Sequence, residues 1–219
     1  MLSPSTYRSD IKRLTTRDGF GDGVVEAGKL DSRVLVLSAD LTESTRALAF
    51  KKAFPDRFIQ MGVSEQSMAT VAAGLALEGF VPFITSYACF SPGRNWEQLR
   101  LVASMQNLPI KIVGAHAGVS VGPDGATHQM LEDIALMRVL PNMTVIAPCD
   151  YLEAKRAVIA SAKLPGPVYI RLARNDTPSF TVQKTPFVIG RAEIFRDGND
   201  IAIIACGPLL HEALCAAKL

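Results

Sequence analysis

Five short apolar runs recur along this chain of 219 residues, and each is bounded by Gly, Pro, Asp or Asn. The runs are residues 34–37, 81–84, 110–113, 143–146 and 168–172. Between them lie stretches with helical periodicity, of which the clearest are residues 66–77, 94–105, 131–140 and 151–162. Short apolar strands that alternate with helices are typical of βαβ units. The sequence therefore predicts an α/β fold, with a parallel sheet flanked by helices on both faces.

The sequence changes in character after the last of these runs. We assign residues 1–174 to the α/β domain, and residues 175–190, which are rich in turn-forming residues and proline, to a linker. Beyond the linker, the pattern predicts a strand at residues 201–205 and a helix that begins near Leu209. One strand and one helix cannot bury both faces of a sheet. Residues 191–219 are therefore expected to be the incomplete start of a second α/β domain.

Composition argues against several classes of function. The net charge is only +2 and the basic residues are scattered, which argues against nucleic acid and a membrane surface as partners. No stretch reaches the roughly 18 apolar residues of a membrane span, and the N-terminus lacks a basic leader with an apolar run. The four cysteines form no CxxC pair, as expected of reduced thiols. We therefore expect a soluble, cytoplasmic protein.

Polar residues follow three of the predicted strands. Asp40, His116 and Arg174 come shortly after the first, third and last apolar runs. Because parallel strands present their carboxyl ends at one edge of a sheet, these three side chains are expected to converge there. Asp40 also has an alternative role, as the cap of a helix that begins near Leu41.

Glu65 lies directly before the predicted helix at residues 66–77, which is rich in small residues and should pack closely. Glu65 is then either a favourable charge at the helix N-terminus, worth about 0.3 to 1 kcal/mol, or an enclosed acid that exchanges a proton with a ligand. Tyr87 and Phe90 stand three residues apart after a predicted strand. They either stack on a flat heterocycle or belong to the core.

Residues 114–128 hold four glycines and two of the three histidines, His116 and His128, between a predicted strand and a predicted helix. A long polar loop of this kind is typical of functional sites. Two histidines and Asp124 lack a fourth ligand, so we predict no metal site in this loop.

Residues 21–23 read Gly-Asp-Gly, which begins a motif that holds magnesium and a diphosphate when an Asn follows at the right spacing. No Asn occurs before Asn95, so we interpret this segment as part of a helix that leads to the first strand.

Five blocks of residues together resemble the transketolase family, and most closely the C-terminal subunit of split, two-chain transketolases. The blocks are residues 38–42, 62–68, 93–100, 124–135 and 170–174, and the similarity runs from about Thr16 to Leu219. The resemblance implies the pyrimidine-binding domain of the thiamine-diphosphate-binding fold, followed by the start of the family's C-terminal domain. It also implies the transfer of a two-carbon ketol unit between sugar phosphates.

The resemblance assigns roles to the candidate residues. Glu65 matches a catalytic glutamate that bonds the aminopyrimidine ring of thiamine diphosphate and promotes loss of the thiazolium proton. Tyr87 and Phe90 match aromatic residues around that ring, and Asp40 matches an aspartate near the cofactor.

On the substrate side, His116, Asp124 and His128 match residues that contact the sugar, and the two histidines are assigned to catalysis. Arg174 matches an arginine that pairs with the sugar phosphate, a task that suits a guanidinium because it binds phosphate in a bidentate manner. Pro123 departs from the family pattern, where Glu is common, and this affects the expected conformation of the loop.

The chain contains neither a domain for the diphosphate and Mg²⁺ nor a complete third domain. We therefore expect the cofactor and Mg²⁺ to be held with a separate N-terminal subunit, in a homodimer or heterotetramer, and the isolated chain to be inactive. Two alternatives stay open. One is a non-catalytic interaction module, and the other is a related enzyme such as a deoxyxylulose phosphate synthase or a 2-oxo acid dehydrogenase beta subunit, which residues 124–128 and 93–100 fit less well.

Overall fold

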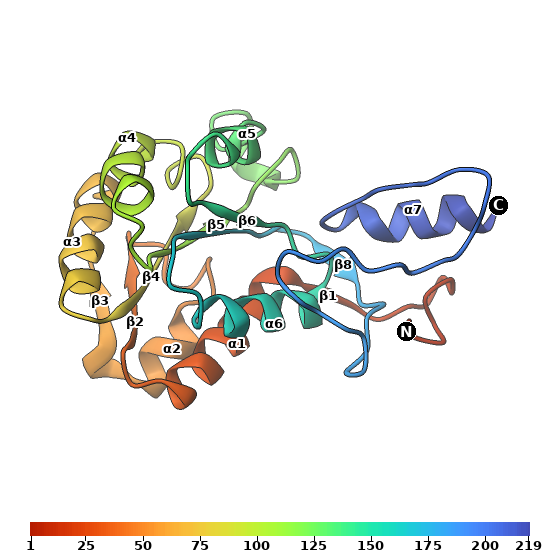
Figure 1. Cartoon of the computed structure of the whole chain (residues 1–219), viewed down its shortest axis with the longest axis horizontal. Helices are drawn as coiled ribbons and strands as arrows, with labels where there is room; N and C mark the ends of the chain where they lie inside the picture. The colour runs from red at the N-terminus through yellow and green to blue at the C-terminus, as the bar shows by residue number, and fades with distance from the viewer.

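A six-stranded parallel sheet forms the centre of the molecule (Figure 1). The computed structural model describes all residues from 1 to 219. The sheet has the order β3-β2-β4-β5-β7-β6, and every pair of neighbouring strands runs parallel. Its strands are β2 (Val34–Ser38), β3 (Phe58–Gln60), β4 (Val81–Tyr87), β5 (Lys111–Ala115), β6 (Thr144–Ile146) and β7 (Val168–Arg171). The predicted α/β class and all five predicted strands of the sheet are confirmed, whereas the short, partly exposed β3 was not predicted.

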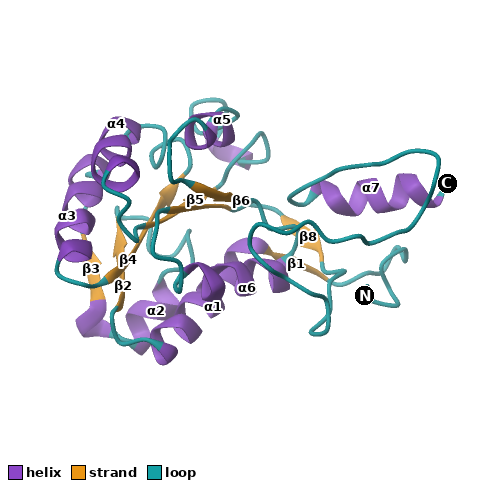
Figure 2. Cartoon of the chain, in the orientation of Figure 1, coloured by secondary structure: helices purple, strands orange, loops and turns teal.

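Helices cover both faces of this sheet, as Figure 2 shows. One layer contains α1 (Thr16–Leu30), α2 (Leu48–Ala53) and α6 (Tyr151–Ser161). The other contains α3 (Glu65–Leu77), α4 (Trp96–Gln98) with its continuation η2 (Leu99–Met105), and α5 (Asp133–Arg138). Short 3₁₀ turns lie at η1 (Pro55–Arg57) and η3 (Gly122–Asp124). Each face encloses a cluster of 16 buried hydrophobic residues, so the sheet is buried on both sides, as parallel sheets generally are.

The Gly-Asp-Gly segment lies inside α1, where glycines allow close packing on α6. A Cβ atom at Gly19 would overlap the carbonyl oxygen of Tyr151, and one at Gly23 would lie 2.9 Å from the carbonyl oxygen of Lys155. Larger residues at these positions would force the two helices apart. The structural interpretation of this segment is therefore confirmed.

The segment expected to be a linker begins with a strand. β8 (Asp176–Pro178) pairs antiparallel with β1 (Arg13–Thr15), apart from the main sheet. Beyond β8, the backbone N–H groups of Phe180 and Thr181 donate hydrogen bonds of 3.0 and 2.8 Å to the fully buried carboxylate of Asp150. Asp150 is also the N-cap of α6. This carboxylate therefore joins the start of the segment to the sheet domain.

The prediction of a strand at residues 201–205 is wrong. No strand forms there, and Ile201, Ile203 and Ile204 are 85, 56 and 96% exposed. These residues belong to the long loop that runs beside α7 (Leu209–Lys218) in Figure 1. A strand requires a neighbour to accept and donate its backbone hydrogen bonds, and no other strand of this chain pairs with these residues. The helix expected near Leu209 is confirmed.

None of the helices is both long and apolar enough to cross a membrane.

Candidate active site

A pocket of about 380 Å³ opens at the carboxyl edge of the sheet. Its lining includes His116 and Arg174, which follow β5 and β7, so the convergence of these two residues is confirmed. The pocket is polar, and nearly all of its lining side chains can form hydrogen bonds. The lining residues are Arg17, Glu43, Ser44, Arg46, Tyr87, His116, Pro123, Asp124 and Arg174.

His116 is held by both its side chain and its backbone conformation. Its side chain stacks on Tyr87 with ring centroids 3.8 Å apart, and its backbone has a φ of 56°. Such a left-handed conformation is strained for a residue with a Cβ and persists only where the surroundings enforce it. The Nδ1 atom of His116 is buried and has no hydrogen-bond partner within the chain. The hydrogen-bonding capacity of this nitrogen is therefore unused within the chain.

Burial lowers the pKa of His116 to about 3, and nearby positive groups act in the same direction. These groups are Arg17, Arg174, Arg46 and His128. The imidazole is therefore neutral at physiological pH, with one ring nitrogen as donor and the other as acceptor.

Arg17 is a site residue that sequence analysis missed. Its guanidinium donates to the carbonyl oxygens of Ser44 at 2.6 Å and Arg174 at 2.7 Å, and its Nε atom is buried without a partner. Burial lowers the pKa of Arg17, but an arginine side chain stays charged in proteins. Nothing in the sequence of α1 marks this arginine, because only the fold brings the first turn of α1 next to the residue that follows β7.

A second missed arginine, Arg46, lies beside it. Its Nε atom donates to Asp18 at 2.7 Å, and its backbone has a φ of 71°. With Arg17 and Arg174, it gives this end of the pocket three guanidinium groups. Such a cluster suits a phosphate or another oxyanion.

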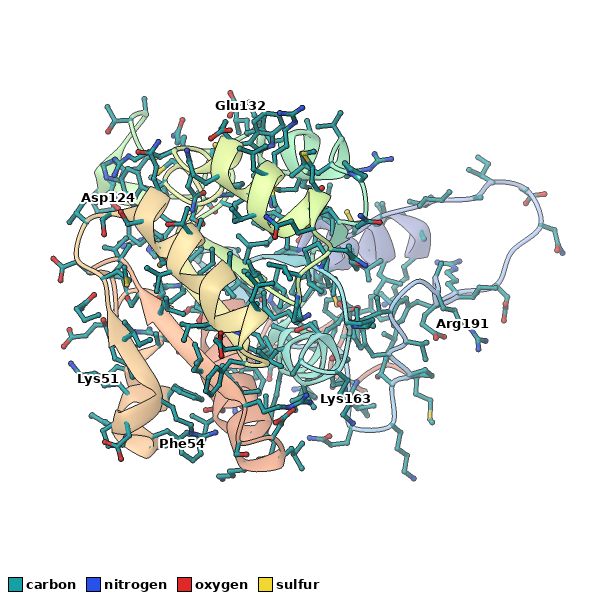
Figure 3. All side chains as sticks on the ribbon, turned by 60° about the vertical axis from the view of Figure 1, so that its left-hand side comes forward. Lys51, Phe54, Asp124, Glu132, Lys163 and Arg191 are labelled. Atoms are coloured by element: carbon teal, nitrogen blue, oxygen red, sulfur yellow. The ribbon has the colours of Figure 1, made fainter.

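Tyr87 and Phe90 face the site rather than the core. Their rings are nearly parallel, with centroids 6.1 Å apart. The His128 ring meets both edge-on, at 6.1 and 5.3 Å. Asp124 is exposed, and in Figure 3 it lies at the outer edge of the molecule on the loop between β5 and α5. The aromatic pair and the two histidines therefore form one wall that a flat ring can contact.

Glu65 is enclosed, with only 1% of its surface exposed. One carboxylate oxygen accepts from the Ser86 hydroxyl at 3.0 Å, and the other accepts from Arg94 at 2.8 Å. Glu65 is also the first residue of α3, so its carboxylate lies in the first turn of the helix, where a negative charge is favourable. Arg94 in turn lies 4.6 Å from the centre of the Phe90 ring and links the acid to the aromatic wall.

A carboxylate has about four acceptor positions, and Glu65 uses two of them within the chain. It can therefore accept a further hydrogen bond from a ring nitrogen of a ligand. The enclosed Glu65 carboxylate, the aromatic wall and the unpaired ring nitrogen of His116 together fit a flat heterocycle that donates a hydrogen bond. Ser86 and Arg94, which hold the carboxylate, were not predicted as site residues, since neither stands in a recognisable spacing to Glu65.

Asp40 lies apart from the pocket. It is exposed after β2, and its backbone N–H donates to Gln60 at 3.0 Å. No helix begins at Leu41, because residues 42–47 form turns and α2 starts only at Leu48. The capping role considered for Asp40 is therefore wrong.

Comparison with known proteins identifies the family and the fold. Residues 12–179 match the family described as transketolase, pyrimidine binding domain. A protein of Methanocaldococcus jannaschii, provisionally named as a transketolase C-terminal section, is 45% identical over 205 residues that cover 93% of this chain and 65% of that protein. The 6-deoxy-6-sulfo-D-fructose transketolase subunit of a Clostridium species is 36% identical and is matched over 92% of this chain and 63% of its own length.

Among solved structures, the chain is similar to a split-gene transketolase described as an inactive beta4 tetramer. The TM-score is 0.85 at 41% sequence identity, and the match covers 94% of this chain and 66% of that one. This chain therefore spans slightly less than two thirds of the length of these relatives. The matched segment, residues 12–179, contains the whole six-stranded sheet and all the pocket residues. The chain belongs to the transketolase family and contains its pyrimidine-binding domain.

Proposed function

We propose that this chain acts as one subunit of a two-chain, thiamine-diphosphate-dependent transketolase, which transfers a two-carbon ketol unit between sugar phosphates. The observation that carries the proposal is the placement of the enclosed Glu65 and of a pocket with histidines and arginines at the same edge of one sheet. A cofactor ring and a phosphorylated sugar require those two kinds of surface, respectively.

The residues on the cofactor side fit thiamine diphosphate. Glu65 would accept a hydrogen bond from the pyrimidine ring, while Tyr87 and Phe90 would contact its face, and we propose that Asp40 lies near the same group. When bound, the cofactor supplies the nucleophilic carbon and the electron sink for carbon–carbon cleavage. The hydrogen bonds from Ser86 and Arg94 would hold the Glu65 carboxylate in position for this contact, and its enclosure excludes water from it.

The residues on the sugar side would bind and orient the substrate. His116 and His128 donate or accept hydrogen bonds at the hydroxyl and carbonyl oxygens of the sugar, and His116 does so as a neutral imidazole. Asp124 is proposed to accept from a further hydroxyl. Arg174 and Arg17 would bind the phosphate, since both line the pocket and Arg17 donates to the backbone carbonyl oxygen of Arg174.

The diphosphate and Mg²⁺ would be held by an N-terminal partner subunit, in a homodimer or heterotetramer of the pair. The names of the M. jannaschii relative, a C-terminal section, and of the split-gene structure support such a division. Exposed apolar side chains support it too. Val71 and Leu77 on α3 are 40 and 66% exposed, and Leu101 and Met105 on the adjoining η2 are 42 and 59% exposed. Such a surface suits contact with another polypeptide.

Reconstitution tests the proposal. The chain is mixed with the N-terminal transketolase section of the same organism, thiamine diphosphate and Mg²⁺, and ketol transfer is measured from a ketopentose phosphate to an aldopentose phosphate. We expect transfer in the mixture and none with either chain alone. Glu65→Gln should lower kcat by about 100-fold or more, as the loss of a proton-transferring group does. Glu97→Gln removes an exposed carboxylate of α4 and serves as the matched control.

The phosphate role has its own readout. Arg17→Met should raise KM about tenfold or more for a phosphorylated donor, because a charge-assisted hydrogen bond is lost. The KM for a donor without phosphate should change little. As a control, Arg191→Met replaces an exposed arginine of the C-terminal segment (residues 175–219) and should leave both KM values unchanged. If the mixture shows no transfer while a longer form of this chain does, the chain as it stands is a non-catalytic module, and the proposal fails.

A further inference from the structure

A buried carboxylate that touches neither the pocket nor the aromatic wall lies behind the loop of residues 116–130. Asp133, the first residue of α5, is fully buried. Its Oδ2 atom accepts hydrogen bonds from the Tyr169 hydroxyl at 2.7 Å and from Arg171 Nε at 2.8 Å. Its Oδ1 atom is buried without a partner. Burying a charge is costly, and here Arg171 supplies the compensating one.

Tyr169 remains a hydrogen-bond donor in this network. Burial and the negative charge of Asp133 raise the pKa of Tyr169 well above its ordinary value, so the phenol keeps its proton. The three side chains therefore form one hydrogen-bonded network. Two of them, Tyr169 and Arg171, lie two residues apart in β7 (Val168–Arg171) and so on the same face of the sheet.

The network contacts the backbone on both sides of His116. A Cβ atom at Gly114, two residues before His116, would overlap the Tyr169 hydroxyl. A Cβ atom at Gly118, two residues after it, would lie 3.1 Å from Arg171 Nη2. Tyr169 and Arg171 therefore each lie close to the backbone of a glycine, and His116 stands midway between these two glycines in the sequence.

The C-terminal end of the loop, at Met130, is hydrogen-bonded to Gly118, which lies beside Arg171. The N–H of Gly118 donates to the carbonyl oxygen of Met130 at 2.7 Å, and Met130 returns a bond of 3.3 Å. His128 precedes Met130 by two residues, and Asp133 follows it by three. The base of the loop is therefore held between the Gly118–Met130 pair and the buried carboxylate.

We propose that the Arg171–Asp133–Tyr169 network is a positioning device that holds His116 and His128 in their orientation toward the pocket, with Asp133 as the positioning residue. The strained φ of 56° at His116 requires a surrounding that enforces it, and the network supplies contacts on both sides. The catalytic consequence rests on the proposed function, whereas the structural consequence does not.

Histidine NMR on the chain alone tests the structural part. The chain has three histidines, so ring ¹³Cε1 labelling gives three signals. In the wild type, the His116 signal should stay that of a neutral ring as the pH falls to about 5. In Asp133→Asn, the loop loosens and admits water, so His116 should begin to titrate between about pH 5 and 7, and His128 should shift. His211, in α7, should not change.

Asp150→Asn is the matched control, since Asp150 is also a fully buried carboxylate that holds neighbouring segments together. It holds Phe180, whose ring centroid lies 5.6 Å from that of His211. This variant should shift His211 and leave His116 and His128 as in the wild type. If Asp133→Asn leaves the His116 and His128 signals unchanged, or if Asp150→Asn disturbs them equally, the network is only part of the general core and the proposal is overturned.

Tyr169→Phe covers the case in which Asp133→Asn does not fold. It removes one hydrogen bond to Asp133 and keeps the ion pair with Arg171. We expect the His116 signal to change with pH in the same direction as in Asp133→Asn but by less. Absence of this change would overturn the proposal.

With the partner subunit and cofactor, Tyr169→Phe and Asp133→Asn should lower kcat by about 10- to 100-fold, the cost of slight misplacement of reacting groups. KM for the phosphorylated donor should change less than about twofold, because Arg17 and Arg174 bind it independently. A change in KM alone would contradict the proposal. Absence of transfer by the wild-type mixture would refute the proposed function, and the NMR result would still decide whether the network positions the loop.

Discussion

Two apolar runs of similar composition adopt different structures in this molecule: one forms a buried strand, and the other forms no strand. Residues 34–38 read Val-Leu-Val-Leu-Ser and form β2, in which every residue is buried. Residues 201–205 read Ile-Ala-Ile-Ile-Ala and form no strand, with Ile204 96% exposed. Both runs contain the β-branched residues that favour strands. β2 has β3 and β4 as hydrogen-bonded neighbours, whereas residues 201–205 have none. Strand formation therefore depends on a partner as much as on composition.

The same contrast holds for the regions around these runs. The sheet domain encloses two clusters of 16 buried hydrophobic residues. The C-terminal segment contributes to one cluster of four, which joins Ile11 and Cys149 to Phe180 and Leu214. In Figure 3, Arg191 lies on this extended segment, on the side of the view opposite Asp124. Stability should therefore be concentrated in the sheet, and substitutions in the two regions should differ sharply.

The largest difference is expected between two isoleucines. Ile112→Ala, in β5, should destabilise the protein by about 2 to 5 kcal/mol, because it removes fully buried methyl groups and leaves a cavity. Ile204→Ala should change the free energy of unfolding by less than about 0.5 kcal/mol. Urea denaturation of both variants measures the difference. A large loss in Ile204→Ala would mean that this segment is buried in solution.

The second prediction concerns how the stability of the sheet domain depends on pH through a buried lysine. Lys111 is fully buried, its Nζ atom donates to the carbonyl oxygens of Leu164 and Gly166 at 2.7 Å each, and burial lowers its pKa to about 7. Between about pH 7 and 10.5 the unfolded chain therefore binds more protons than the folded one, so Lys111 makes stability rise with pH across that window. Stability therefore falls as the pH is lowered from about 10.5 to about 7, and it levels off below that pH, where Lys111 is charged in both the folded and the unfolded chain.

Lys111→Met should remove this rise. The measurement is the urea midpoint of wild type and variant at several pH values between 7 and 10.5. The difference between the two proteins should change steadily with pH, since all other titrating groups are shared. Parallel profiles would show that the folded protein does not penalise the charge of Lys111.

A smaller difference is expected between two glycines. Gly19→Ala should cost about 1 to 3 kcal/mol, because the added methyl group overlaps the backbone of α6. Gly198→Ala, in the C-terminal segment, meets nothing within 4 Å and should be neutral or stabilising by up to about 1 kcal/mol. Thermal unfolding distinguishes the two. Equal changes in the two melting temperatures would mean that the α1–α6 contact tolerates a methyl group at Gly19, which would contradict close packing of these helices.

The smallest effect concerns the connection between the two regions. Asp150→Asn should cost about 1 to 2 kcal/mol, since asparagine keeps one acceptor oxygen but turns an N–H group toward a backbone donor. Hydrogen exchange should become faster at Phe180 and Thr181, whose amides donate to Asp150, while β5 keeps its protection. Faster exchange throughout the sheet would show that the two regions unfold as one unit.

Some residues of the candidate site could be predicted from the sequence pattern, and others could not. His116 and Arg174 were predicted because each follows a strand, and the carboxyl ends of parallel strands share an edge. Arg17 lies at the start of a helix and Arg94 lies beyond a loop, whereas Ser86 is near the carboxyl end of β4; the roles of all three depend on contacts with residues far away in the chain. Asp40 follows β2 as His116 follows β5, yet it lies outside the pocket, whereas Glu43 and Arg46, further along the same connection, line it.

The sequence by itself determined the alternation of strands and helices, the family, and the loop that carries two histidines, since these depend on local periodicity and on residues close together in the chain. Only the tertiary structure decided which strands found partners, which arginines surround His116, and that Ser86 and Arg94 hold Glu65. Hydrogen bonds between strands and contacts between charges form across long separations in sequence. Their geometry is therefore a property of the assembled sheet rather than of any segment.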